Sequence, residues 1–465
     1  MSTATLVPQS IPLTGRHLIE ASAGTGKTHN ITRLYIRLLL ESGLEVQHIL
    51  VMTFTKAATE ELRGRIDAEL RRAKANWGNL GKDDSFYAAL EEKFTRQQAI
   101  PVLRHALLHL DEAAIFTIHG FCARVLRQHA FSGGISMEVE MEADTTELAL
   151  EALRDWFRTI GHDPAYQFLM ELGWHTPERF WDKFSRAISK RNQLLVTKAE
   201  DLLQYWMDAK GAVKGQLLGE EGLILDRLVN PHQQKEQRLT EWAELLAWLD
   251  LDDFSEPPKV AMAFVNGNRY RGQEDLMALF QPFKELKAQA EKEAERAAAC
   301  DAYEVVYQGI EYVREAFAEA KERQAVMDFD DLITLLSERL QSPEGAGLAA
   351  QLQVQYPVAL VDEFQDTDPQ QYAILDRLYP SGQALFMIGD PKQAIYSFRG
   401  GDIFTYLQAR NHADHRWHMD TNWRSVEAMV QGYNRLFRGA PPDAEGREVF
   451  GYGIEYEQIK ATPKA

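Results

Sequence analysis

The amino-acid sequence predicts an α/β fold: a parallel sheet with helices on both faces, carrying a large all-helical insert. Two observations lead to this prediction. In roughly the first 140 residues, short apolar, β-branched runs alternate with helical patterns, which is typical of a parallel sheet. A block of about 180 residues rich in Glu, Lys, Ala and Leu then interrupts this alternation, and the first pattern returns after it.

The bulk composition is that of a globular protein. The chain has 465 residues, of which 45% are hydrophobic and 10% aromatic, enough for several packed cores. No window reaches the roughly 18 uncharged apolar residues of a membrane helix, and the N-terminus lacks the features of a signal peptide. Cys122 and Cys300 form neither a disulfide framework nor a zinc spacing. These features predict a cytoplasmic protein that does not associate with membranes.

The net charge of −18 disfavours a nucleic-acid binder that acts through its overall charge. Exposed charges are screened beyond about 8 Å at physiological salt, however, so a locally basic groove can work inside an acidic protein. The charge therefore does not exclude nucleic acid as a partner.

The alternation of strands and helices sets the expected order of elements. The first three expected strands are residues 16–21, 48–55 and 113–121, and the helices after them are 27–40, 57–75 and 121–128. Two more apolar strands, 356–364 and 383–390, end in acidic residues. The expected parts are 1–143 and 327–415 for one α/β domain, 144–326 for the insert, and 416–465 for the start of a further domain.

The insert carries six of the nine tryptophans, which we interpret as helix-packing core. Within it, residues 256–272 are predicted to be a loop, because they contain two prolines and several glycines and asparagines. By composition, residues 283–300 are predicted to be an exposed charged helix.

The stretch IEASAGTGKTHNI, residues 19–31, is typical of a phosphate-binding loop between a strand and a helix. Gly24 and Gly26 let backbone N–H groups turn toward phosphate oxygens, Lys27 can reach the β- and γ-phosphates, and the Thr28 hydroxyl can bind Mg²⁺. Ala21 stands where the strict pattern has glycine. The candidate nucleotide-binding residues are Ala21, Ser22, Ala23, Gly24, Thr25, Gly26, Lys27 and Thr28.

A pair of acids, in VDEFQD (residues 361–366), follows a later strand. Adjacent acids at a buried strand end are costly without a cation, so Asp362 is expected to hold Mg²⁺ together with Thr28. Glu363 is the candidate general base for an attacking water. A phosphate loop combined with this pair predicts hydrolysis of a nucleoside triphosphate.

Four further stretches place polar, basic or aromatic groups at expected strand-to-helix corners, where α/β sheets bind ligands. They are TFTKAATEELRGRI (53–66), FTIHGF (116–121), IGDPKQAIYSFRGGDIFTY (388–406) and TNWRS (421–425). Together with the phosphate loop and DEFQDTDPQQ, this ordered set resembles superfamily 1 DNA helicases of the UvrD, Rep and PcrA type. The residues of these motifs are most similar to those of the RecB-type branch of that family.

The resemblance implies a RecA-like P-loop motor domain and further roles for individual residues. Residues 1–143 and 327–415 would form motor domain 1A, 144–326 the inserted domain 1B, and 416–465 the start of motor domain 2A. Gln365 and Gln393 would sense the γ-phosphate of ATP. Trp423 stands where the family has a Tyr that stacks on adenine, and Arg424 would contact the γ-phosphate.

The resemblance also implies residues that contact DNA. Phe398 replaces a Trp of UvrD-like motors, but it keeps an aromatic ring for stacking on bases. The residues expected along the path of single-stranded DNA are Thr53, Phe54, Thr55, His119, Tyr396 and Phe398.

The implied activity is ATP- and Mg²⁺-dependent 3′-to-5′ movement on DNA in double-strand break repair and recombination, with DNA ends and RecC-like and RecD-like subunits as partners. Two alternatives stay open: a standalone UvrD-like repair helicase, and a non-motor DNA-binding or assembly module. Later family motifs and a nuclease domain do not occur in these residues. We therefore expect the chain to be the N-terminal part of a longer protein, with little DNA-stimulated ATP turnover alone.

Overall fold

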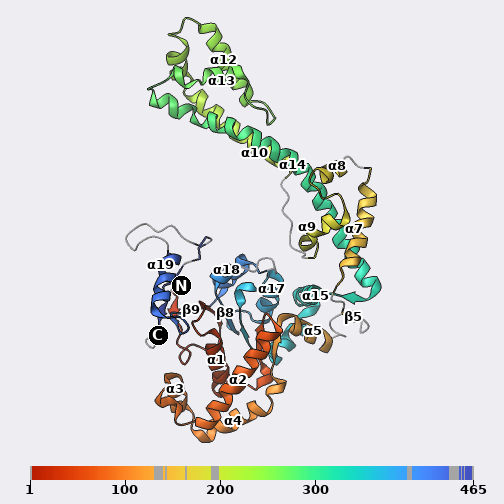
Figure 1. The fold of residues 1–465 in the computed structure, drawn as a ribbon, viewed down its shortest axis with the longest axis vertical. Coiled ribbons are helices and arrows are strands. Elements are labelled where there is room, and N and C mark those ends of the chain that lie inside the picture. Colours follow the sequence, from red (N-terminus) through yellow and green to blue (C-terminus); the bar gives the residue numbers. More distant parts are fainter. Residues whose placement is uncertain are drawn as a thin grey trace. The chain divides into compact units, whose positions relative to one another are not determined.

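The structure is a computed structural model that describes residues 3–129, 140–141, 144–162, 165–189, 198–394, 401–438, 450–451, 453–454 and 456–462. The chain divides into two compact units, labelled by element in Figure 1. Unit 1 comprises residues 1–143 and 327–465, and unit 2 comprises residues 144–326. Each unit is described by itself below.

Unit 1 is built on a seven-stranded sheet in the order β1-β9-β2-β8-β7-β3-β4, and every pairing in it is parallel. Its strands are β1 (Ala4–Thr5), β2 (Arg16–Ala21), β3 (Ile49–Thr53), β4 (Ile115–Thr117), β7 (Val358–Val361), β8 (Ala384–Gly389) and β9 (His415–Met419). The predicted α/β fold with a parallel sheet is confirmed.

Helices cover both faces of this sheet because alternate strand residues are apolar on both sides. Ile19, Ile49 and Val51 pack on one face in a core with α1 (Lys27–Glu41), α2 (Lys56–Asn76), α3 (Ser85–Lys93) and α4 (Arg96–Leu108). Leu18 and Leu50 point to the other face. There they pack in a second core with α5 (Ile118–Gln128), α15 (Phe329–Gln341), α16 (Ala346–Gln355), α17 (Pro369–Leu378) and α18 (Ile403–His412).

Strand β9 was not expected from the sequence. It pairs with β2, so Trp417 lies opposite Ile19 and His418 lies opposite Glu20. The boundary expected between residues 415 and 416 falls inside this strand, and the sheet of unit 1 therefore extends to Met419. The prediction missed β9 because HRWHM contains two histidines and an arginine among its five residues and lacks the apolar run of the central strands.

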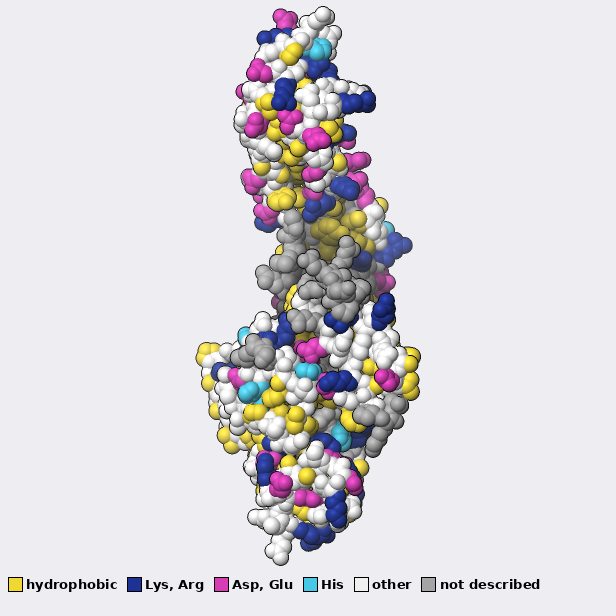
Figure 2. Space-filling model, turned by 90° about the vertical axis from the view of Figure 1, so that its left-hand side faces the viewer, with side chains coloured by type: hydrophobic (Ala, Val, Ile, Leu, Met, Phe, Trp, Pro, Cys, Tyr) yellow, Lys and Arg dark blue, Asp and Glu magenta, His cyan; other side chains and the backbone are white. Residues whose placement is uncertain are grey.

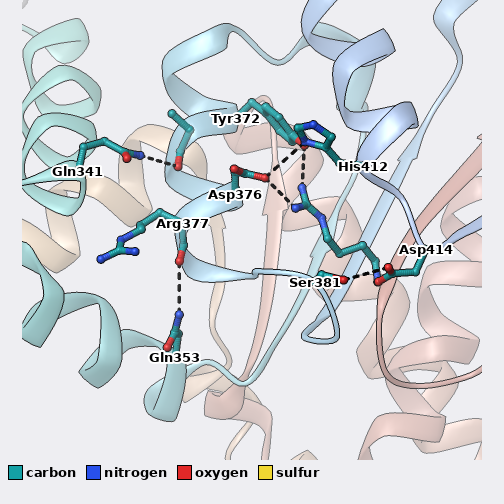
Figure 3. A network of polar contacts seen from close by, with 10 residues as sticks. Gln341, Gln353, Tyr372, Asp376, Arg377, Ser381, His412 and Asp414 are labelled. Atoms are coloured by element: carbon teal, nitrogen blue, oxygen red, sulfur yellow. Dashed lines mark hydrogen bonds and ion pairs between the residues drawn. The ribbon is translucent and has the colours of Figure 1, made fainter.

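A buried arginine ties β2 to the helices on the second face. The Arg16 guanidinium donates to Asp376 Oδ1 at 2.7 Å and to the Tyr372 hydroxyl at 2.7 Å. Tyr372, Asp376 and His412 lie close together in Figure 3, whereas Asp414 lies beside Ser381 and accepts from the Arg16 backbone N–H at 2.8 Å. The start of β2 is thus fixed to α17 and to the turn before β9.

Apart from Val326, which begins the short strand β6 (Val326–Met327), the regular elements of unit 2 are helices in its described residues, and they enclose two apolar cores. One core combines α10 (Ala199–Gly219), α12 (Lys235–Leu249) and α13 (Lys259–Phe264) with the first half of α14. The other combines α7 (Thr146–Ile160), α8 (Ala165–Glu171) and α9 (Pro177–Ser189) with the second half of α14. The helix α14 (Glu274–Gln324) is 51 residues long and contributes to both cores.

Two expectations for unit 2 were wrong. Residues 256–272 are not all loop, because α13 forms within them and buries Ala261 and Phe264. Residues 283–300 are not fully exposed, because Phe283 and Ala290 are completely buried on one face of α14. The tryptophan prediction is confirmed for Trp156, Trp206, Trp242 and Trp248, which are at most 4% exposed.

Two surface properties bear on the choice of partner. No helix within the described residues combines the length and apolarity that crossing a membrane requires. On the face shown in Figure 2, Lys and Arg side chains are interspersed with Asp and Glu side chains, and neither sign forms a continuous field. This face therefore offers no broad electrostatic attraction for nucleic acid.

Candidate functional site

The carboxyl ends of the parallel strands meet at one edge of the unit 1 sheet, and the predicted phosphate loop lies there after β2. Gly24 and Gly26 have φ values of +82° and +89°, which glycine adopts without strain. Gly26 is the N-cap of α1, so the first N–H groups of this helix open toward the loop. The Thr25 hydroxyl donates to the Ser22 carbonyl at 2.7 Å and closes the turn.

The segment 421–425 packs directly on this loop. The Asn422 amide donates to the Ala23 carbonyl at 3.0 Å, and the Trp423 N–H donates to the Gly24 carbonyl at 2.8 Å. A Cβ added at Gly24 would lie 2.9 Å from the Asn422 side chain and 3.1 Å from Arg424 Cβ. Glycine at position 24 therefore permits both the turn and the close approach of the second segment.

A cavity of about 740 Å³ opens beside the loop. Thr25, Gly26 and His29 line one side of it, and Trp423 lines it from the packed segment. Asp83, Asp84 and Ser85 contribute a third wall. The Trp423 ring is 64% exposed, so its face is open to a planar ligand.

The two predicted acids follow β7, which is separated from β2 by β8 in the sheet. Burial, and after it the charge of Glu363, raise the pKa of Asp362 to about 6, although the charge of Lys27 acts to lower it. Glu363 has a left-handed backbone with φ of +50°, which is uncommon for a residue other than glycine. Its Oε2 accepts from Lys27 Nζ at 2.6 Å and from Gln365 Nε2 at 2.8 Å. The loop lysine and the candidate base are thus in direct contact.

The residues present fit a magnesium–nucleotide site. Asp362 is a mostly buried carboxylate whose ionised form a divalent cation would stabilise, and Thr28 lies in the first turn of α1. No cluster of three or more His, Cys, Asp or Glu side chains could hold a metal in the part of the chain that the structure describes. Mg²⁺ in nucleotide sites needs only one or two protein oxygens, since phosphates and water supply the others.

Gln365 bridges the acids to the segment after β8. Its Oε1 accepts from the buried Asp390 N–H at 3.0 Å, and a Cβ at Gly389 would lie only 2.6 Å from this oxygen. The Asp390 carboxylate in turn accepts from Gln393 Nε2 at 2.8 Å. A continuous set of contacts therefore runs from Lys27 through Glu363, Gln365 and Asp390 to Gln393.

Three of the residues expected to contact DNA lie at the end of β3. The Thr53 side chain is buried, and its hydroxyl hydrogen-bonds to that of Thr59 at 2.6 Å inside the turn into α2. Thr55 caps α2 by accepting from the Ala58 N–H at 3.1 Å. Phe54 lines a cavity of about 20 Å³ together with Asp362 and Glu363, so this strand end adjoins the acids.

His119 lies in the first turn of α5. Its Nε2 is 3.9 Å from Asp330 Oδ1, and its ring meets Phe329 edge-on at 6.2 Å between centroids. The other two expected DNA contacts, Tyr396 and Phe398, lie outside the described residues.

Sequence reasoning missed Asn422 and Asp390, which hold the site together. Asn422 Oδ1 accepts from the N–H groups of both Arg424 and Ser425 at 2.8 Å, so this side chain orders the whole segment. Both residues lie in stretches that the sequence analysis singled out, 388–406 and 421–425, but no role was predicted for either one. Their position beside predicted site residues was the signal that could have identified them.

Comparison with known proteins places this geometry in a family. A sequence model for the UvrD/REP helicase N-terminal domain matches residues 4–414. The RecBCD enzyme subunit RecB of Escherichia coli (strain K12) is 35% identical over 476 aligned residues, which cover 93% of this chain and 39% of that protein.

Two other relatives agree with this match. The RecBCD enzyme subunit RecB of Haemophilus influenzae is 31% identical, with 94% of this chain and 41% of that protein covered. The subunit of the same name from Mycolicibacterium smegmatis is 30% identical, with 91% of this chain and 30% of that protein covered. The chain thus spans about two fifths or less of the length of these relatives.

Proposed function

The chain belongs to the UvrD/REP helicase family, and we propose that it is the N-terminal motor region of a RecB-type subunit. The proposed activity is ATP-driven 3′-to-5′ movement on single-stranded DNA during double-strand break repair and recombination. The proposed setting is the cytoplasm, with DNA ends and RecC-like and RecD-like subunits as partners. Within this proposal, residues 1–143 and 327–415 act as motor domain 1A together with the rest of β9 up to Met419, residues 144–326 act as domain 1B, and the residues after Met419 act as the start of domain 2A.

One observation carries the proposal: the phosphate loop, the acid pair and the segment 421–425 meet at one edge of one sheet. Lys27 contacts Glu363 at 2.6 Å, and Asn422 contacts Ala23 at 3.0 Å. Residues widely separated in sequence thus supply a phosphate cradle, a candidate base and an aromatic platform to the same site.

We assign the roles of the loop and the acids from this geometry. The N–H groups around Gly24 and Gly26 would bind phosphate oxygens, and Lys27 would bind the β- and γ-phosphates of ATP. Bound Mg²⁺, held by Thr28 and Asp362, would offset charge on these phosphates. Glu363 would take a proton from the water that attacks the γ-phosphorus, and the bond to the ADP oxygen would break.

The remaining roles follow from position. Trp423 presents an open ring face in the cavity beside Gly26, which suits stacking on adenine. The Cβ of Arg424 lies close to Gly24 of the phosphate loop, and from there the side chain can reach a γ-phosphate. Gln365 and Gln393 would sense whether a γ-phosphate is present, and both contact Asp390. A change at Asp390 would be passed to the segment that follows it, which includes the proposed DNA contacts Tyr396 and Phe398.

We propose that single-stranded DNA passes along the ends of β3 and β4, and that Phe54, Thr55 and His119 face the DNA. Thr53 would contribute indirectly, because its hydroxyl is already bound within the turn. Base stacking is worth about 1 to 3 kcal/mol per base and tolerates any sequence, as a translocating motor requires.

The test is binding of a fluorescent ATP analogue with Mg²⁺ to the 465-residue chain and to Lys27→Ala. The variant removes the charged donor to the phosphates, so we expect its Kd to rise tenfold or more, which is about 1.4 kcal/mol. Lys235→Ala, at an exposed position in unit 2, is the matched control and should bind like the unchanged chain. Equal affinity of Lys27→Ala and the control, with matching thermal unfolding, would reject the ATP site.

A further inference from the structure

Glu20 is an unusual residue for its place in the sheet. It is the fifth residue of β2, a central strand, and lies opposite Gly389 of β8 and His418 of β9. Side chains two apart share a face, so Glu20 points to the same side as the buried Leu18, toward α18. Parallel strands covered on both faces normally carry apolar residues at such positions.

The surroundings of Glu20 are charged as well as buried. Burial raises the pKa of Glu20, Lys392 and Arg410 act against that rise, and Glu457 and Asp390 add to it. The Tyr406 hydroxyl on α18 is buried and has no hydrogen-bond partner among the described residues, and burial and then the charge of Glu20 raise its pKa. A nearby cation can offset the cost of a carboxylate in such a place.

Lys392 and Arg410 are the cations that act on Glu20, and Lys392 is the one that lines a cavity with it. Lys392 and Glu20 line the same cavity of about 20 Å³, which His418 and Glu457 also line. The Lys392 ammonium contacts Asp390 Oδ1 at 2.8 Å, and the two side chains are only 14% and 3% exposed. Lys392 thus lies among carboxylates that come from two adjacent strands, β2 and β8.

Asp390 connects this arrangement to the nucleotide side. Its other oxygen accepts from Gln393 Nε2 at 2.8 Å, and its N–H donates to Gln365, which contacts Glu363. Asp390 Oδ1 also accepts from the Lys392 backbone N–H at 3.1 Å, so a shift of the Lys392 ammonium would leave this oxygen with the backbone contact alone and would loosen the carboxylate that Gln393 contacts.

We propose that Glu20 is a positioning residue that holds Lys392 against Asp390, and thereby fixes Gln393 relative to the phosphate loop that follows Glu20 itself. Electrostatic attraction would then link β2, the strand that leads into the phosphate loop, to the segment that contains Asp390 and Gln393. Through this segment, bound nucleotide is proposed to affect DNA binding. This inference rests on the proposed function, because Gln393 is taken to link the nucleotide to DNA.

The experiment measures coupling between nucleotide and DNA in the 465-residue chain. Fluorescence anisotropy of a labelled oligo(dT) gives the DNA Kd with and without a non-hydrolysable ATP analogue and Mg²⁺, and the ratio of the two values is the coupling. Glu20→Gln keeps the shape of the side chain and removes its charge, and Lys392→Met removes the cation. The double variant completes a cycle, and Glu457→Gln controls for loss of a negative charge from the same cavity.

We expect a coupling of about fivefold or more for the unchanged chain and for Glu457→Gln. Glu20→Gln should reduce the ratio of the two DNA Kd values at least threefold. The Kd of this variant for the nucleotide should change less than twofold. If Glu20 acts through Lys392, the double variant should be no worse than Lys392→Met alone. A role in stability alone would lower the unfolding temperature and leave the ratio intact.

Three results would overturn the inference: unchanged coupling in Glu20→Gln, additive losses in the double variant, or no coupling in an unchanged chain that binds both ligands. Failure of the unchanged chain to bind the nucleotide at all would instead contradict the proposed function, and the two failures are therefore distinguishable.

Discussion

At the scale of single residues, Asn422 shows how the site depends on a side chain without a catalytic role. It donates to the Ala23 carbonyl and accepts from two N–H groups, so one amide links the phosphate loop to the Trp423 segment. This explains why Gly24 has no room for a Cβ.

We predict that Asn422→Ala weakens binding of the ATP analogue about three- to tenfold, because loss of the amide frees the segment that carries Trp423 and Arg424. Titration of the fluorescent analogue measures this effect. Lys235→Ala, at an exposed position in unit 2, is again the control. An Asn422→Ala chain with unchanged affinity would show that the link is dispensable.

His17, at the start of β2, gives a second prediction at this scale. Its Nδ1 accepts from Trp417 Nε1 at 3.0 Å and its Nε2 lies 3.0 Å from the Thr14 carbonyl, so the ring is neutral. Burial lowers the pKa of His17 to about 4. In the unfolded chain His17 therefore binds a proton as the pH falls below about 6.5, whereas the folded chain excludes this proton until the pH approaches 4. The free energy of unfolding therefore decreases as the pH falls from about 6.5 to about 4.

Urea unfolding of the chain and of His17→Gln at several pH values checks this prediction. The variant cannot be protonated, so the stability advantage of the unchanged chain should shrink as the pH falls, by at most about 3 kcal/mol in total. An advantage that stays constant between pH 7 and pH 4.5 would contradict the assignment of a neutral buried His17.

At the scale of elements, the contact between α14 and α7 is set by a glycine. A Cβ built at Gly309 would lie 2.4 Å from the Trp156 ring, which is buried in the core of α7, α8 and α9. The helix accepts a residue of poor helix propensity here because the indole ring needs the space.

We predict that Gly309→Ala destabilises unit 2 by about 1 to 3 kcal/mol, because the methyl group overpacks against Trp156. Gly215→Ala, on α10 with nothing within 4 Å of its Cβ, is the matched control and should stabilise by about 0.5 to 1 kcal/mol. Chemical unfolding followed by tryptophan fluorescence separates the two. Stabilisation by both substitutions would mean that Trp156 does not pack on Gly309.

The elements also show what sequence patterns can and cannot predict. The buried runs of β2, β7 and β8 were predicted because both faces of each strand are covered and apolar. The strand β9 was missed because its side chains are only partly buried up to Met419, and its pairing with β2 joins residues about 400 apart in sequence. Such a pairing is fixed by the tertiary fold and leaves no local periodicity.

At the scale of the whole molecule, the chain consists of an α/β unit that carries the candidate site and a helical unit with its own two cores. Motif spacing predicted the phosphate loop and the acid pair, because their chemistry requires those residues. The contacts that assemble them, such as Asn422 with Ala23 across 399 positions, depend on strand order and could not be predicted from spacing.

The central claim is that this sheet edge binds ATP and communicates with DNA. The most direct measurement is the oligo(dT) affinity of the chain and of Lys27→Ala, with and without the non-hydrolysable ATP analogue and Mg²⁺. We predict that both proteins bind oligo(dT), and that the nucleotide shifts the affinity about fivefold or more only in the unchanged chain. No binding of oligo(dT), or an equal nucleotide effect in Lys27→Ala, would contradict the claim.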